Sequence, residues 1–186
     1  RLLLAMRDGL WRFDPASARL NLRLGVSDYL GVLLLPGLYR LLRSDAPGIS
    51  IAVVSQPVNE TIARLLAGEV DVATAVDPPE GRNLFNAPLM EEKFDCVMRA
   101  DHPLAGGRLT VKRLLDYPHV AATAHGASAT IVDRAFAACG LRRQVPVSVS
   151  LFSTVLGLVA ESDLVAFLPR RLCQVHARRF GLVAKA

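Results

Sequence analysis

The residues that could carry chemistry fit the common catalytic patterns poorly. Gly126-Ala-Ser128-Ala-Thr130 resembles the sharp turn that presents a hydrolase serine, but the second glycine of that pattern is absent. Glu91 and Glu92 are adjacent on a segment expected to be extended, so their carboxylates point to opposite faces. The four histidines lack the spacing that places two ring nitrogens on one metal ion. We therefore predict neither a catalytic residue nor a metal site.

The glycine and cysteine patterns argue against a bound cofactor. The 13 glycines never form G-x-G-x-x-G or G-x-x-x-x-G-K-[ST], so the usual backbone nests for dinucleotides and nucleoside triphosphates are missing. The three cysteines are odd in number and form no C-x-x-C pair, which argues against a disulfide framework and a structural zinc site. We expect no cofactor.

Polar residues instead follow the predicted strands, at points where several helices begin. Helix N-termini offer unpaired N–H groups and a partial positive charge, so a small anion can bind there without a dedicated lysine. Ser128, Thr130 and Ser153 could equally be ordinary helix caps, and this alternative stays open. The candidate loops are 27–29, 55–56, 75–77, 125–130 and 152–153. Their convergence on one cleft would make them a binding site.

The first part of the chain predicts strands and helices in alternation. Leucines at helical spacing from Leu30 to Leu42 predict a helix with Pro36 in an early turn, and an apolar stripe over 58–66 predicts another that Gly68 ends. The predicted strands are 21–27, 49–54 and 70–76. This order predicts a parallel sheet, and in such sheets ligands lie at the carboxyl ends of the strands.

An extended segment, residues 89–99, leads into a second unit with the same alternation. Thr110 is predicted to cap one helix and Gly140 to end another. The predicted elements are helix 111–116, strand 119–123, helix 129–139, strand 145–149, helix 154–161 and strand 164–168. We expect two similar α/β units, joined by extended crossover segments, with a cleft between them.

Composition excludes several classes of protein. The chain has 186 residues, 52% of them apolar, and a formal charge of +5, so it is too apolar for intrinsic disorder. The longest charge-free stretch, 144–160, contains Pro146 and several hydroxyl residues, so no membrane span is expected. Residues 1–8 lack a secretory signal, which favours the cytoplasm. The basic excess lies at the two ends without recognition patterning, so direct DNA binding by this segment is not expected.

Five stretches resemble, in the right order, the effector-binding domain of LysR-type transcriptional regulators. Residues 13–28 resemble the family's linker and first strand, and 35–48 the helix that follows. Residues 65–73 are similar to the L-x-x-G-x-x-D-x-A signature, in which Asp71 can meet backbone N–H groups near the start of a strand. Residues 99–120 resemble the entry to the second subdomain, and 162–171 the return crossover.

The resemblance implies a fold class and a division of the chain. The fold is α/β, with two Rossmann-like α/β subdomains joined by crossover strands, as in type II periplasmic binding proteins, and with a truncated C-terminus. Residues 1–19 would be the tail of the linker helix and the linker, 20–98 plus 165–186 subdomain I, and 99–164 subdomain II.

The resemblance also implies a function. A small effector, aromatic or carboxylate, would bind between the subdomains and change the oligomer and DNA-binding state of a bacterial regulator. The entry residues look most like members that respond to flavonoids, phenols or salicylate. The resemblance implies three kinds of partner. They are the effector, further copies of the chain in a homodimer or homotetramer, and DNA, which would be bound through an N-terminal winged helix-turn-helix that this chain lacks. The implied effector-site residues are Ser27, Asp28, Ser55, Val76, His125, Ser128, Thr130, Ser153 and Phe167.

Two other classes of protein share this bilobed fold. A solute-binding protein of a transporter should carry a secretory signal or a lipid-anchor cysteine. An enzyme should place acids, bases or arginine clamps in the cleft, and beyond His125 and Asp28 the sequence offers none there. We therefore do not expect an enzyme.

Overall fold

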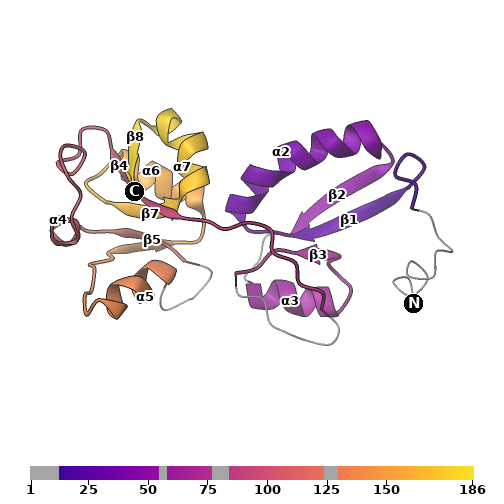
Figure 1. Ribbon diagram of the computed structural model, residues 1–186, viewed down its shortest axis with the longest axis horizontal. Helices are drawn as coiled ribbons and strands as arrows, with labels where there is room; N and C mark the ends of the chain where they lie inside the picture. The colour runs from indigo at the N-terminus through magenta and orange to yellow at the C-terminus, as the bar shows by residue number, and fades with distance from the viewer. Residues whose placement is uncertain (1–12, 55–57, 77–83, 124–129) are drawn as a thin grey trace. The chain divides into compact units, whose positions relative to one another are not determined.

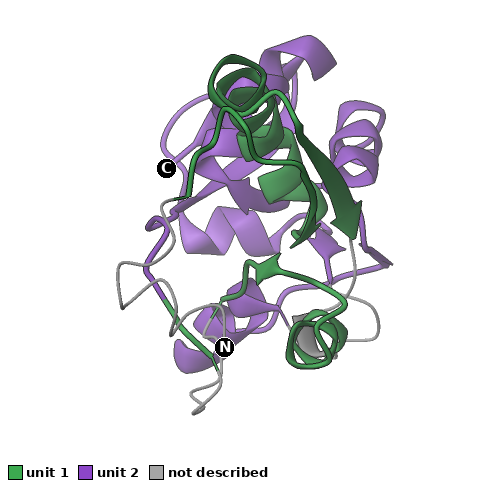
Figure 2. Ribbon diagram, turned by 90° about the vertical axis from the view of Figure 1, so that its right-hand side faces the viewer, with its two compact units in different colours: residues 1–86 green, residues 87–186 purple. Residues whose placement is uncertain are grey.

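The computed structural model describes residues 13–54, 58–76, 84–123 and 130–186. The chain divides into two compact units, Arg1–Asn86 (unit 1) and Ala87–Ala186 (unit 2) (Figure 2). Helices alternate with strands in both, which confirms the predicted α/β class. The structure groups residues 87–98 and 165–186 with unit 2, whereas the sequence-based division placed them in subdomain I.

Unit 1 contains a three-stranded parallel sheet in the order β2-β1-β3. The strands are β1 (Leu20–Gly25), β2 (Ile49–Val54) and β3 (Val72–Ala73). Helices α2 (Asp28–Asp45) and α3 (Val58–Leu66) lie on opposite sides of these strands (Figure 1). The predicted parallel sheet is confirmed, but β3 is shorter than expected because only Leu24 and Gly25 of β1 pair with it.

Helix α2 begins earlier than the leucine spacing predicted. The Ser27 hydroxyl accepts a hydrogen bond from Leu30 N at 3.3 Å, and Asp28 places a negative charge in the first turn. Pro36 therefore lies in the interior of the helix rather than in an early turn, and the prediction for it was wrong. Its missing N–H leaves the Val32 carbonyl without the usual partner in the helix.

The predicted role of Asp71 is confirmed. Its carboxylate accepts hydrogen bonds from Arg23 N at 2.8 Å and from the Arg23 guanidinium at 2.7 and 3.1 Å. Hydrogen bonds from the side chain and the backbone of Arg23 lower the pKa of Asp71 to about 2. These contacts fix the start of β3 against β1, so this part of the family signature maintains the scaffold.

Unit 2 contains two small sheets. Strand β4 (Phe94–Arg99) lies between β7 (Ala166–Pro169) and β8 (Leu182–Lys185), antiparallel to both. Strands β5 (Val120–Ala122) and β6 (Val147–Val149) form a parallel pair. The predicted strands 119–123 and 145–149 thus pair in parallel, and His119 forms a parallel bridge with Val165, as the repeated pattern predicts. The antiparallel pairings were not predicted, because in them the second half of the chain returns to both edges of β4.

Five helical segments accompany these strands. The first three match predicted helices, whereas the last two, together with β8, were not predicted. Thr110 and Thr130 cap α4 and α5 as expected, and Gly140 ends α5 with a φ of 70°. The segments are α4 (Val111–Leu115), α5 (Ile131–Ala138), α6 (Phe152–Ala160), α7 (Arg170–His176) and the 3-10 helix η1 (Ala177–Phe180).

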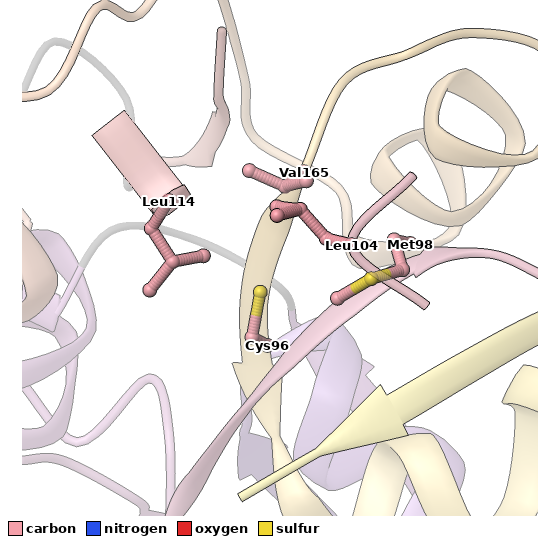
Figure 3. Close-up of a cluster of buried hydrophobic side chains, with 5 residues drawn as sticks. All are labelled: Cys96, Met98, Leu104, Leu114 and Val165. Atoms are coloured by element: carbon pink, nitrogen blue, oxygen red, sulfur yellow. The ribbon is translucent and has the colours of Figure 1, made fainter. Parts of the chain in front are cut away.

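The core of unit 2 lies against β4. Its central cluster comes from strands, a helix and a loop that are far apart in the sequence (Figure 3), and comprises Cys96, Met98, Leu104, Leu114 and Val165. His102 is buried at the edge of this cluster and packs edge-on against Tyr117. Its Nδ1 accepts from Leu104 N at 3.0 Å, so the proton lies on Nε2, which donates to the Asp163 carbonyl at 3.3 Å. His102 and Leu104 therefore belong to the buried core of unit 2.

Two cationic side chains hold the loop that follows β4. The Arg113 guanidinium donates to the carbonyls of Pro103, Gly106 and Arg108 at 2.9 to 3.4 Å. Lys185 Nζ, at the end of β8, donates to the carbonyls of Leu104 and Gly107 at 3.1 and 2.9 Å. The loop carbonyls therefore have partners without forming a strand or a helix.

Candidate functional site

A pocket of about 220 Å³ lies within unit 2. Most of its wall is apolar: Phe94 comes from β4, Phe167 from β7 and Phe152 from the start of α6, while aliphatic side chains come from β5 and α5. The lining residues are Phe94, Val120, Ala121, Ala122, Thr123, Thr130, Ile131, Val132, Arg143, Phe152 and Phe167. Its polar groups are gathered where the N-terminus of α5 meets Arg143.

Thr130, Asp133 and Arg143 form one hydrogen-bonded cluster, here called the polar edge. Asp133 Oδ2 accepts from both the backbone N and the hydroxyl of Thr130 at 2.7 Å, and Asp133 N donates to Thr130 Oγ1 at 3.1 Å. This is a reciprocal capping box at the start of α5. Arg143 donates from Nε to Asp133 Oδ1 at 2.7 Å and from Nη2 to Thr130 Oγ1 at 3.1 Å. The helix cap and the pocket wall thus share one network.

The two charges of the polar edge differ in burial. The Arg143 side chain is 3% exposed, whereas that of Asp133 is 29% exposed. Burial raises the pKa of Asp133, but the hydrogen bonds from Arg143 and Thr130 outweigh it and hold the pKa well below its usual range. Asp133 therefore stays ionised and compensates the charge of the buried guanidinium.

An aromatic cluster lies behind the Phe167 wall of the pocket. The fully buried His119 ring stacks on Phe167 with centroids 5.9 Å apart and meets Phe136 edge-on at 6.0 Å. His119 Nε2 donates to the Leu114 carbonyl at 3.1 Å, while Nδ1 has no hydrogen-bond partner within the described ranges. Burial lowers the pKa of His119, so the ring stays neutral. The neutral His119 ring therefore packs directly against the Phe167 ring.

Two of the predicted site residues come together in this pocket. Thr130 and Phe167 both line it, and Thr130 also caps α5, while their binding of an effector stays a prediction. Ser153 is not part of the lining and is exposed on α6, whose N-cap is Leu151 and has no side-chain cap. The alternative that Ser153 is an ordinary N-cap is thus excluded, because α6 begins at Phe152, the neighbouring residue that does line the pocket.

Three of the remaining predicted residues belong to the other unit. Ser27, Asp28 and Val76 lie in unit 1, where Ser27 and Asp28 begin α2 and Val76 is 72% exposed. Their predicted meeting with residues of the second unit stays a prediction. Three others, Ser55, His125 and Ser128, lie outside the described residues.

Sequence reasoning missed Arg143 and Phe94, and in the candidate loop 152–153 it selected Ser153 instead of Phe152. The adjacent Arg142-Arg143 pair is typical of an exposed turn, although only Arg142 is exposed. The signal that was present is Thr130-x-x-Asp133, which predicts a capping box and hence a partly buried carboxylate in need of a cation.

The described residues contain neither a group of metal ligands nor a membrane-spanning helix. Within residues 13–54, 58–76, 84–123 and 130–186, His, Cys, Asp and Glu side chains form no group of three that could hold a metal ion. Over the same ranges, no helix is both long and apolar enough to cross a bilayer.

Comparisons with known proteins agree with one another. The sequence model of a protein family described as LysR substrate binding domain matches residues 16–186. The HTH-type transcriptional activator NahR of Pseudomonas putida is 30% identical over 172 residues, which are 92% of this chain and 57% of NahR. The chain thus spans little more than half the length of such relatives.

Solved structures give the same result. The regulatory domain of MexT, a transcriptional activator in Pseudomonas aeruginosa, has a TM-score of 0.78 and 28% identity, over 91% of this chain and 82% of that chain. The effector binding domain of QuiR in complex with shikimate has a TM-score of 0.73 over 91% of this chain and 81% of that chain. At 17% identity the QuiR domain supports the fold alone.

Proposed function

Since the chain belongs to the family of LysR substrate-binding domains, we propose that it is the effector-sensing domain of a bacterial DNA-binding transcriptional regulator. A small molecule, aromatic or carboxylate, binds in the pocket of unit 2 and thereby changes the oligomeric and DNA-binding state of the whole regulator. DNA is contacted through a separate winged helix-turn-helix domain, and the regulator acts as a homodimer or homotetramer in the cytoplasm.

The pocket is the observation that carries this proposal. A wall of three phenylalanines with a polar edge at one side is the usual make-up of a small-molecule site, in which apolar contacts give affinity and a few polar groups give orientation. The polar edge is also the cap of α5, so a molecule seated there contacts a helix terminus and the strands β4, β5 and β7 at once. Such a molecule favours whichever conformation holds these elements in contact with it, and this difference in affinity shifts the population of regulator states.

Binding without catalysis accounts for the pocket residues best. The lining offers two threonine hydroxyls and an arginine that is already paired with Asp133, and a paired guanidinium has no proton to transfer. We therefore favour a binding domain over an enzyme on the same fold, and membership of the LysR family favours a sensor over a solute-binding protein of a transporter.

A thermal-shift screen of single-ring aromatic compounds and small carboxylates tests the proposal. A ligand should raise the melting temperature of the full chain, and Phe167→Ala should abolish the shift. Phe85→Ala is the matched control, because Phe85 is 92% exposed and lies in unit 1. Should Phe167→Ala prove too unstable, Ala122→Leu fills the pocket from β5 instead. Shifts that survive both pocket variants would refute the proposal.

A further inference from the structure

Building on the proposed function, we propose that the unit 2 pocket selects a neutral, single-ring aromatic molecule with one hydrogen-bonding group over the corresponding carboxylate, and that Asp133 sets this preference. Within the described part of the chain, Asp133 does not line the pocket and acts through Arg143. It is thus a positioning and charge-balancing residue.

The pocket has room for one aromatic ring. It measures about 220 Å³, and an apolar protein cavity of about 150 Å³ is enough to hold benzene. The remaining volume admits a small substituent on the ring.

The walls favour an aromatic ring over an aliphatic chain. Phe94, Phe152 and Phe167 stand on three different elements, so an inserted ring can meet phenyl groups from several directions. Such ring pairs stabilise a complex beyond the burial of apolar area. Phe167 is itself backed by the stacked ring of His119, which limits how far it can yield to a ligand.

Charge decides between a neutral ligand and an anion. Arg143 is the one charged side chain among the described residues that line the pocket, and its partner Asp133 lies 2.7 Å away. A carboxylate entering the pocket loses its hydration and is attracted by Arg143, but the ionised Asp133 already compensates the charge of Arg143 and repels the anion. The ion pair therefore offers little net compensation for burying an anion.

Hydrogen bonding to a neutral group is still available. The Arg143 guanidinium carries five N–H groups, and its hydrogen bonds to described residues, Asp133 and Thr130, use two of them. The others can donate to a carbonyl or hydroxyl oxygen on the ring. Thr123, at the end of β5, adds a hydroxyl that both donates and accepts.

Benzamide and benzoate test the inference, because they match in size and shape and differ in charge. NMR titrations of the full chain at pH 8 should give a dissociation constant for benzamide at least tenfold lower than for benzoate. In Asp133→Asn the side chain keeps its shape but loses its charge, so the preference should shift toward benzoate by at least tenfold. Asp116→Asn, a change at an exposed aspartate of unit 2, should leave the ratio unchanged.

The outcomes separate this inference from the proposed function. If benzoate binds as tightly as benzamide and Phe167→Ala abolishes the binding of both compounds, the inference is overturned and the sensor proposal stands. An unchanged ratio in folded Asp133→Asn would also overturn it. Binding of neither compound would overturn the inference, while the sensor proposal would still depend on the wider thermal-shift screen.

A second measurement needs no variant at the polar edge. 4-Nitrophenol changes colour on ionisation, so the absorbance of the bound molecule reports its charge. We expect the wild-type chain to bind the protonated form and so to raise the pKa of the bound phenol. A bound phenolate spectrum would contradict the inference even if Asp133→Asn does not fold.

Discussion

Removing Asp133 should destabilise the protein far more than removing its partner Arg143. Asp133→Ala leaves a guanidinium that is 3% exposed without a counter-charge, and breaking a buried pair in this way costs about 3–5 kcal/mol. Arg143→Met leaves a carboxylate that is 29% exposed and still accepts two hydrogen bonds from Thr130, so its cost is that of a charged hydrogen bond, about 1.5–3 kcal/mol.

The double variant gives the sharper test. Adding Arg143→Met to Asp133→Ala removes the unpaired buried charge, so the double variant should be more stable than Asp133→Ala alone. Urea unfolding followed by far-UV circular dichroism at pH 7 measures all three free energies. Arg142→Met, at the exposed neighbour, should change stability by no more than about 0.5 kcal/mol. A double variant less stable than Asp133→Ala would refute the charge argument, and with it the basis for ligand selection.

Three further predictions concern the scaffold. Gly25→Ala should lower the free energy of unfolding by about 1–3 kcal/mol, because a Cβ there overlaps Thr61 Cγ2. Gly37→Ala, in open space on α2, should instead raise it by about 0.5–1 kcal/mol. Equal effects of the two changes in chemical denaturation would contradict this packing. Burial lowers the pKa of His119 below 6.5, so the neutral ring's contribution to stability is present above pH 6.5 and lost as the pH falls through the lowered pKa. His119→Phe should therefore flatten the acid side of the stability profile, and an unchanged profile would argue against a neutral buried ring. Lys185→Met should lower the melting temperature by releasing two loop carbonyls, at about 1 kcal/mol each, and an unchanged value would show that water replaces the ammonium.

Local signals predicted much of the fold. The glycine that ends α3 and the threonines that cap α4 and α5 act within one turn of their own position, so their roles follow from neighbouring residues alone. Asp71 was also predicted, although its partner Arg23 lies in another strand, because the signature around it is a family property.

Features that depend on distant pairing were not predicted. The antiparallel order of β7-β4-β8 requires the last strand to meet a strand from the middle of the chain, and nothing in the composition of 182–185 specifies that partner. Likewise, Arg143 is buried only because Asp133 and the pocket wall surround it, and its own neighbours in sequence are those of a surface turn. Of the implied effector site, Thr130 and Phe167 meet in the pocket because the N-terminus of α5 and strand β7 both reach it.

The pairing of β4 also has a consequence during protein synthesis. Cys96 of β4 pairs with Phe167 on one side and with Lys185 on the other, whereas β1 finds its partner β2 within the first third of the chain. At a ribosomal rate of 5–20 residues per second, β4 waits about 4–18 seconds for those two neighbours to be made. The parallel pair of unit 1 can form during translation, but the central strand of the β7-β4-β8 sheet is synthesised long before the two strands that flank it. Nascent chains of this protein should therefore depend on a chaperone that binds in that interval.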